Sequence, residues 1–336
     1  MKRNWMAYAV ALVCVLFVLA ACGKGEDKAP TTSNDDKKTG TTEETEKYKI
    51  GVTQIVEHPS LNAAYDGFKK AIEDAGLDVE YDVQNAQNDN SVNTTIANNL
   101  AGSGVDLIFA NSTPSAQAVA AVTQDIPVVF TSVTDAVTAE LVASMESPGA
   151  NLTGTIDNHP DAIPNTMKLL QEMGAKNVGM VFNAGEQNSR AQVDAVKELL
   201  KDMDMKVEEA AVATSADVKQ AAESLIGKVD AFYIITDNTV VSALESVIDV
   251  ANENKIPMMV GEFDSVKRGG LAAYGFEYYD IGYEAGEMAV KILKGESEPA
   301  TLPVQVPQNL KLIMNKDTAD AIELDIKDEW NAEFSD

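Results

Sequence analysis

Residues 105–130 read VDLIFANSTPSAQAVAAVTQDIPVVF and predict a strand, a helix and a second strand. The runs 105–110 (VDLIFA) and 127–130 (PVVF) are short and continuously apolar, which is the pattern of parallel strands buried on both faces. Between them, Thr113 and Pro114 predict a helix start, with the threonine as N-cap and the proline in the first turn. This order of elements predicts a βαβ unit, the repeating unit of a doubly wound parallel sheet.

The same alternation of strand and helix continues on both sides of this unit. Before it, residues 48–56 (YKIGVTQIV) predict a strand, and Pro59 opens a stretch whose apolar residues share one helical face. After it, a second series of strands separated by helices is predicted by the apolar runs at 177–182, 206–212, 231–235 and 257–260. Within that series, Ser189 followed by Gln192 predicts a capping box at a helix start. Two such series in tandem predict an α/β protein with two lobes of like architecture.

The start of the chain has the features of a bacterial secretory signal. Basic residues precede an apolar run at 7–19, and small residues stand directly before Cys22. We therefore predict a signal peptide at 1–21. A cysteine at the cleavage point looks like the lipobox of bacterial lipoproteins, which implies acylation of Cys22 and an extracytoplasmic protein anchored to the cell membrane. The alternative is an uncleaved membrane helix, because the apolar run approaches the lower limit of about 17 residues for spanning a bilayer.

The composition is typical of a globular body on a polar tether. After the lipidated Cys22, residues 22–47 carry almost no apolar side chains, so they cannot offset the entropy of ordering and are predicted to be disordered. Cys14 lies within the signal, which leaves one cysteine and no internal disulfide after processing. The net charge of -27 repels nucleic acid and anionic headgroups, so no nucleic-acid partner is expected.

Short stretches spread along the body are typical of one family when they occur together, although none is specific alone. They are QIVEHP (54–59), NSTPSAQ (111–117), TSVTD (131–135), NLTGT (151–155), EQNS (186–189), TDNTV (236–240), GE (261–262) and GGLA (269–272). Through them the chain, from about Tyr48 to Asp325, resembles the substrate-binding lipoproteins of ABC importers. Within that family it is similar to the group associated with tryptophan and related aromatic amino acids.

The resemblance implies a periplasmic-binding-protein-like fold of type I, an α/β fold in which two doubly wound parallel-sheet lobes close over a ligand. Three hinge crossings between the lobes are implied, near 153–157, 275–278 and 299–307. The implied organisation is lobe 1 at 48–154 plus 279–300, lobe 2 at 155–278 plus 308–325, and a C-terminal tail at 326–336.

Polar residues follow the predicted strands at the places where open parallel sheets bind ligands, beyond the strand ends and near helix N-termini. Asn111, Ser112 and Thr113 follow the strand at 105–110, and the free N–H groups of the next helix suit a carboxylate. Hydroxyl and backbone donors after the strand at 127–130 would complete the same task, at Ser132, Thr134 and Asp135. Helix capping is the alternative role of each residue, because these residue types cap helices in any case.

The second series offers carboxylates for an ammonium group. Asp237 follows the strand at 231–235, and a carboxylate in a closed cleft needs a cationic partner. Its alternative role is again helix capping, and Glu262 is the second candidate for the amine. Four more residues at strand ends either contact the ligand or shape the turn: Glu57, His58, Asn188 and Ser189.

Several functions are not expected from this sequence. Only Arg190 and Arg268 remain after the signal, whereas strongly anionic ligands favour bidentate arginines. The chain has no Walker A loop, no G-x-S-x-G elbow and no H-E-x-x-H motif, so neither enzyme chemistry nor a cofactor is expected. Its two histidines are His58 and His159, far apart in sequence, and no metal site is expected.

We therefore predict a monomeric protein that binds a small zwitterionic ligand between its lobes. The resemblance implies an aromatic amino acid as ligand and an ABC permease in the membrane as partner. Two alternatives stay open, a sugar- or nucleoside-binding protein of the same fold and a ligand-sensing lipoprotein without a permease.

Overall fold

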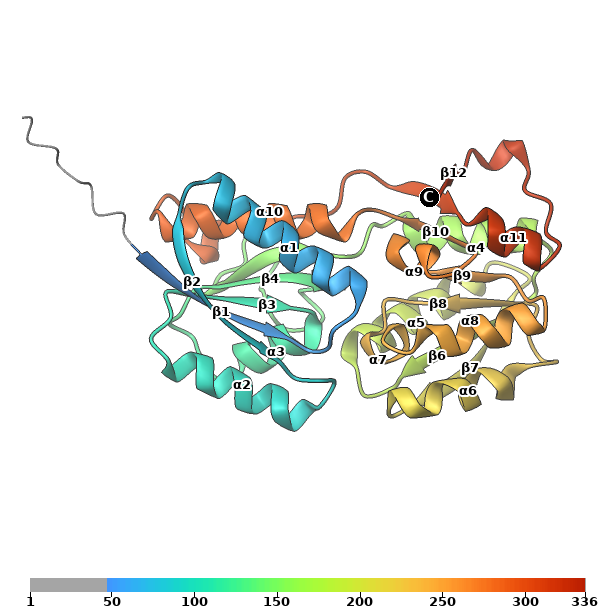
Figure 1. Ribbon diagram of the computed structural model, residues 1–336, viewed down its shortest axis with the longest axis horizontal. Coiled ribbons are helices and arrows are strands. Elements are labelled where there is room, and N and C mark those ends of the chain that lie inside the picture. Colours follow the sequence, from blue (N-terminus) through green and yellow to red (C-terminus); the bar gives the residue numbers. More distant parts are fainter. Residues whose placement is uncertain (1–46, 336) are drawn as a thin grey trace, which may run out of the picture. The chain divides into compact units, whose positions relative to one another are not determined.

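The computed structural model describes residues 47–335. The predicted signal peptide, the predicted lipidation site at Cys22 and all but the last residue of the predicted tether lie outside the described residues. Within 47–335, no helix has the length and apolar character needed to cross a membrane. The described part of the chain forms two β-sheets, each accompanied by its own helices (Figure 1).

The first sheet belongs to the first lobe, and its strands are all parallel. They are β1 (Lys47–Gln54), β2 (Asp78–Asn85), β3 (Leu107–Asn111), β4 (Val128–Val133) and β5 (Leu152–Ile156). Their order across the sheet is β2-β1-β3-β4-β5 (Figure 1). Every residue of β3 and β4 is buried, as expected for the two continuous apolar runs that flank the predicted helix. The helices of this lobe are α1 (Pro59–Asp74), α2 (Asn90–Gly102), α3 (Thr113–Ala120) and α10 (Tyr278–Leu293).

Helix α10 comes late in the chain but packs against α1 of the first lobe (Figure 1). Glycines allow the two backbones to approach closely. A Cβ atom placed on Gly282 would lie 1.9 Å from the carbonyl oxygen of Ala64, and one on Gly67 would lie 2.0 Å from that of Tyr279. Because no side chain fits at either position, this packing fixes α10 to the first lobe.

The second sheet is larger and mixed. Its strands are β6 (Asn177–Asn183), β7 (Lys206–Val212), β8 (Ala231–Ile234), β9 (Met258–Val260), β10 (Ala272–Gly275), β11 (Lys311–Met314) and β12 (Glu333–Phe334), in the order β12-β11-β10-β9-β8-β6-β7. Strands β6 to β10 are parallel, whereas β11 runs antiparallel to β10. The helices of this lobe are α4 (Ala162–Glu172), α5 (Gln187–Leu200), α6 (Val218–Leu225), α7 (Asn238–Val241), α8 (Leu244–Glu253), α9 (Phe263–Lys267) and α11 (Lys316–Ala321). Short 3-10 helices occur at Ser215–Asp217, Pro299–Thr301 and Asp328–Trp330.

The predicted fold class is confirmed, because both lobes are built from parallel βα units. Three details of the sequence prediction are wrong. Helix α5 begins at Gln187 with Glu186 as N-cap, so Ser189 lies inside its first turn and does not open a capping box. Helix α3 has Ser112 as N-cap in place of Thr113. The end of the chain is not a free tail, because β12 pairs with β11 and Trp330 is buried, with Nε1 donating to Glu172 at 3.2 Å.

The chain passes between the two sheets at three places. It leaves the first sheet after β5, returns after β10, and leaves again after α10 on its way to β11. In the last passage, Gln305 forms an isolated parallel bridge with Thr155, and the backbone N–H of Gln305 donates to the carbonyl of Gly154 at 2.9 Å. The first and third passages therefore run side by side next to the edge of the first sheet.

Candidate ligand-binding site

A small cavity lies where the two lobes meet. Residues of both lobes and of the passages between them line it. From the first lobe come the start of α1 and the end of β4, and from the second lobe the turns after β8 and β9. The lining residues are His58, Leu61, Ser132, Asp157, Thr236, Asn238, Val241, Glu262 and Tyr278. A larger hollow of ≈ 1170 Å³ beside α10 is open to solvent, and none of these polar groups lines it.

Asp157 follows β5 directly and brings an incompletely bonded carboxylate to the cavity. Its Oδ2 atom accepts a hydrogen bond of 2.6 Å from the hydroxyl of Tyr278. Its Oδ1 atom is buried and accepts no well-formed hydrogen bond from any described residue. Burial raises the pKa of Asp157 above its usual range, and the hydroxyls of Tyr278, Thr134 and Thr236 around the carboxylate oppose that rise.

Ser132 lies next to Asp157 and carries an open hydroxyl. It is 5% exposed, has a left-handed φ of 54°, and its Oγ atom has no hydrogen-bond partner among the described residues. The two residues are neighbours because β4 and β5 pair with Val133 opposite Ile156, and the N–H of Asp157 donates to the carbonyl of Val133 at 2.9 Å. The ends of these two strands therefore bring a free donor beside a free acceptor.

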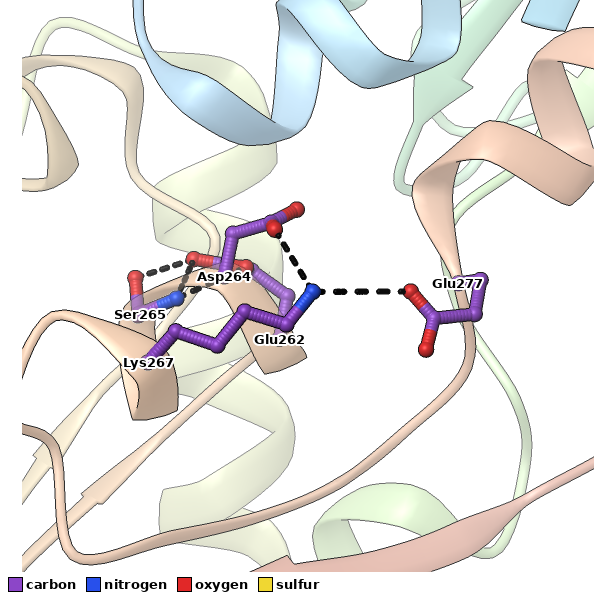
Figure 2. A network of polar contacts seen from close by, with 5 residues as sticks. All are labelled: Glu262, Asp264, Ser265, Lys267 and Glu277. Atoms are coloured by element: carbon purple, nitrogen blue, oxygen red, sulfur yellow. Dashed lines mark hydrogen bonds and ion pairs between the residues drawn. The ribbon is translucent and has the colours of Figure 1, made fainter. Parts of the chain in front are cut away.

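Glu262 is the second carboxylate of the cavity and comes from the second lobe. It is the N-cap of α9 and accepts hydrogen bonds from the N–H of Ser265 at 3.1 Å and from the Ser265 hydroxyl (Figure 2). Lys267 lies nearby, with Nζ 3.2 Å from Asp264 and 4.0 Å from Glu277 (Figure 2). Burial raises the pKa of Glu262, and its hydrogen bonds with Ser265 act in the opposite direction.

Asp237 does not line the cavity, and its carboxylate is fully used within the second lobe. Oδ2 accepts from the N–H of Asn183 and from the hydroxyl of Ser189, both at 2.6 Å. Oδ1 accepts from the N–H of Val240 at 2.8 Å, which is the N-cap bond of α7. Burial, and secondarily the charge of Glu186, raise the pKa of Asp237 to about 7. In this structure Asp237 is a helix cap.

His58 lines the cavity as an uncharged ring. It is the N-cap of α1, and Nδ1 accepts from the N–H of Leu61 at 3.4 Å. Burial, and secondarily the charge of Arg268, lower the pKa of His58 to about 3, so the imidazole is neutral at physiological pH. Its side chain also forms a hydrogen bond with Asn238 of the opposite lobe.

The remaining residues predicted for the site support the walls without lining the cavity. Asn111 donates to Gln54 at 3.0 Å and to the carbonyl of Leu61 at 2.8 Å, and so ties the end of β3 to α1. Asp135 accepts from two backbone N–H groups of the next turn, at 3.0 Å each, and Glu57 is exposed. The others are held by hydrogen bonds to neighbouring protein groups: Ser112, Thr113, Thr134, Asn188 and Ser189.

Side chains of the two lobes also bond directly to each other around the cavity. Nδ2 of Asn88, in the turn after β2, donates to Oγ1 of Thr239 at 2.7 Å. Gln192 of α5 lies 3.4 Å from the hydroxyl of Thr134, and Gln187 lies 3.2 Å from that of Thr138. These contacts hold the lobes in a closed arrangement.

Several lining residues were missed in the sequence, and Asp157 is the most important of them. It falls at the carboxyl end of a parallel strand, where ligand-binding residues are expected, but it lies in a passage between lobes and opens no helix directly. Tyr278 lies in the second passage and had no motif to mark it. The other lining residues that were missed are Leu61, Thr236, Asn238 and Val241.

Two α/β lobes joined by three passages, with a polar cavity between them, define a hinged ligand-binding protein. The chain belongs to the family of ABC transporter substrate binding proteins, whose members it matches over residues 49–333. A tyrosine-binding protein of Clostridioides difficile (strain R20291) is 42% identical over 331 residues, which cover 96% of this chain and 94% of the relative.

Two solved structures extend this comparison. An ABC domain in complex with L-Trp from Streptococcus pneumonia matches with a TM-score of 0.81 and 31% identity, over 86% of this chain and 99% of that chain. The ligand-free, open structure of a substrate-binding protein with adhesive properties from Clostridium difficile is 42% identical over the same shares, 86% and 99%, but its TM-score is only 0.64. The open structure therefore superposes less well although its sequence is more similar. This agrees with the hydrogen bonds that hold the two lobes closed here.

Proposed function

We propose that this protein is the ligand-binding component of an ABC importer and that its ligand is an aromatic amino acid. The family supports the first part of the proposal. The tyrosine-binding relative and the L-Trp complex support the second. The observation that carries the proposal is the pair formed by Asp157 and Ser132, an open buried carboxylate oxygen beside an open buried hydroxyl.

This pair matches the head of an α-amino acid. The ammonium and carboxylate of such a ligand are attached to one carbon, so the site must offer an acceptor and a donor side by side. We assign the ammonium to Oδ1 of Asp157 and the carboxylate to the hydroxyl of Ser132. A buried carboxylate is costly unless a cation pairs with it, so the ligand ammonium stabilises Asp157 in its charged form.

This assignment replaces Asp237, which the sequence favoured for the ammonium. All the bonds to Asp237 come from its own lobe, and both of its oxygen atoms already accept hydrogen bonds. Asp157 is located differently, because it lies between the lobes and Tyr278 of the second passage contacts it. A ligand bound there contacts the parts of the chain that move when the lobes close, so binding favours the closed form.

The apolar part of the cavity suits a ligand side chain. Leu61 at the start of α1 and Val241 at the end of α7 come from different lobes and line the same cavity. An aromatic ring between them would bury apolar surface on both faces only when the lobes are closed, at about 25 cal/mol for each Å² removed from water.

The placement of the protein in the cell follows from the start of the sequence. We propose cleavage before Cys22, acylation of its thiol, and a polar tether that holds the two lobes outside the cytoplasm near a permease. A gene for a permease and one for an ATPase beside this gene would support an importer, whereas their absence would favour a ligand-sensing lipoprotein.

A thermal-shift screen tests the ligand class. Tyrosine, phenylalanine or tryptophan should raise the melting temperature, because a ligand that binds only the native state stabilises it by about 2.7 kcal/mol at a hundredfold excess over Kd. Ribose, glucose and nucleosides serve as the comparison set. A shift with a sugar or nucleoside, and none with any amino acid, would overturn the proposed ligand.

A further inference from the structure

The cavity contains one carboxylate more than an amino acid head requires. Asp157 and Glu262 both line it, and the neutral His58 adds no charge. A zwitterionic ligand brings a single ammonium group. The second carboxylate therefore needs another partner, and its position indicates which part of the ligand that partner belongs to.

Glu262 reaches the cavity from the lobe opposite the head-group pair. The head-group pair comes from the ends of β4 and β5 in the first lobe, whereas Glu262 caps α9 in the second lobe. The residue of the first lobe whose hydroxyl lowers its pKa is Ser60, in the first turn of α1, directly beside the apolar wall residue Leu61. His58 and Asn238 line the cavity as well and hydrogen-bond to each other.

The carboxylate of Glu262 has capacity for one more donor. Its described hydrogen bonds all come from Ser265, which leaves lone pairs open on its two oxygen atoms. Lys267 lies close enough to interact with its charge and is itself held by Asp264 and Glu277 (Figure 2). In its ionised form the carboxylate acts as an acceptor only.

We propose that Glu262 accepts a hydrogen bond from a hydroxyl group on the side chain of the ligand, so that the site selects a phenol over a plain aromatic ring. This inference rests on the proposed function, and it identifies tyrosine as the preferred aromatic amino acid. A buried site built to bond a hydroxyl discriminates against an analogue without it, because the site's own polar group is then left unpaired.

Calorimetric titration of the wild type with tyrosine, phenylalanine and O-methyltyrosine tests the preference. Tyrosine should bind at least about tenfold more tightly than phenylalanine, the effect of a lost hydrogen bond to a charged group. O-methyltyrosine keeps the oxygen but cannot donate, so it should lose at least as much. Equal binding of tyrosine and O-methyltyrosine, or of tyrosine and phenylalanine, would overturn the inference while leaving the proposed function intact. Binding of none of the three would overturn both.

The variant Glu262→Gln tests the residue. It should reduce the preference for tyrosine over phenylalanine to about threefold or less, because a neutral amide makes a weaker bond than a carboxylate. Glu253→Gln removes a matched charge from the exposed end of α8 and should keep the full preference. If Glu262→Gln also keeps the full preference for tyrosine, or weakens the binding of tyrosine and phenylalanine equally, Glu262 does not bind the ligand hydroxyl. If Glu262→Gln shows no cooperative melting transition, the O-methyltyrosine comparison in the wild type decides.

Discussion

The hydroxyl of Tyr278 donates a hydrogen bond of 2.6 Å to Oδ2 of Asp157, and this bond joins two of the passages between the lobes. Tyr278 is the first residue of α10, and Asp157 follows β5. Because Oδ2 is fixed in this way, Oδ1 remains as the open atom of a buried carboxylate. A group that bonds to Oδ1 therefore interacts directly with the hinge of the protein.

Asp157→Asn should weaken binding of an aromatic amino acid by about 2–5 kcal/mol, the range for removing one partner of a buried charge pair. The des-amino analogue, 3-(4-hydroxyphenyl)propanoate, has no ammonium and should lose much less. Titrating both ligands into both proteins gives the coupling energy as a double-mutant cycle. Asp161→Asn, an exposed aspartate before α4 whose side chain makes no capping bond, is the control. A coupling energy near zero would contradict the assignment.

The ligand-free protein should respond to Asp157→Asn in the opposite direction. The folded-state pKa of Asp157 is raised above that of the unfolded chain, so its stability contribution is greatest at low pH and is lost as the pH rises through the folded-state pKa. Above the folded-state pKa the charged carboxylate opposes folding unless a cation binds. The melting temperature of ligand-free Asp157→Asn should therefore equal or exceed that of the wild type, while its response to ligand is smaller.

Asp237 should affect the pH dependence of stability and leave the recognition of the ammonium unchanged. Its pKa is raised from 3.8 to about 7 in the folded protein. The stabilising contribution of the protonated form is complete below about pH 4 and is lost as the pH rises toward 7. In urea unfolding of the ligand-free proteins, the stability of Asp237→Asn relative to the wild type should rise between pH 5 and 7.5.

Asp230 provides a control of opposite sign for that experiment. Backbone N–H bonds from Lys176 and Asn177 lower the pKa of Asp230, so its contribution is present above about pH 4 and lost at lower pH. Asp230→Asn should therefore destabilise the protein by a similar amount at pH 5 and at pH 7.5. If Asp237→Asn behaves in the same way, the raised pKa is wrong. If the double-mutant cycle instead gave a large coupling energy between Asp237 and the ligand ammonium, Asp237 would be the amine-binding residue.

Asn88 should contribute to affinity by holding the closed form. Its Nδ2 atom reaches Thr239 of the other lobe at 2.7 Å, and its φ of 61° is in the left-handed region. Asn88→Gly removes the amide without backbone strain and should weaken ligand binding by about 0.5–1.5 kcal/mol, the value of one hydrogen bond. The change should be seen in the dissociation rate by surface plasmon resonance, because the lobes reopen more readily.

Gln87→Gly is a matched control, since Gln87 precedes Asn88, is exposed, and has a similar φ of 52°. It loosens the same loop without removing a bond between the lobes. If the two variants dissociate at the same rate, the effect comes from loop flexibility and the hydrogen bond to Thr239 does not hold the closed form.

The fold could be predicted because burial of parallel strands leaves a direct mark in the sequence. Continuous apolar runs became β3, β4 and β8 with every residue buried. The buried face of a helix was predicted less accurately than the buried strands. The apolar pattern of residues 90–101 predicts that Val92, Ile96 and Leu100 point inward, yet Val92 is 43% exposed. It lies in the first turn of α2, where the neighbouring elements do not cover it.

The ligand site could be predicted only in part, because a polar residue after a strand has two possible uses. Ser132 and Glu262 were predicted from this position and do line the cavity, whereas Asp237 had the same local signature. Contacts with residues remote in sequence distinguish Asp237 from the two residues that line the cavity. Asn183 and Ser189 both bond to Oδ2 of Asp237, and no local pattern encodes those contacts. Asp157 was missed for the converse reason, since its role depends on Tyr278 far along the chain.

Cys22→Ser should release the protein from the membrane, because the thiol is the only group in the predicted lipobox that accepts the acyl chain. Cells grown with labelled fatty acid should incorporate label into the wild type and none into the variant, which should accumulate as an unprocessed precursor or be found in the medium. The control is Cys14→Ser, which changes the other cysteine of the chain within the signal and should keep labelling and membrane fractionation unchanged. Purified residues 47–336 contain neither cysteine and should still bind ligand, since the residues that line the cavity fall within 58–278. A labelled, membrane-bound Cys22→Ser protein would show that the anchor lies elsewhere.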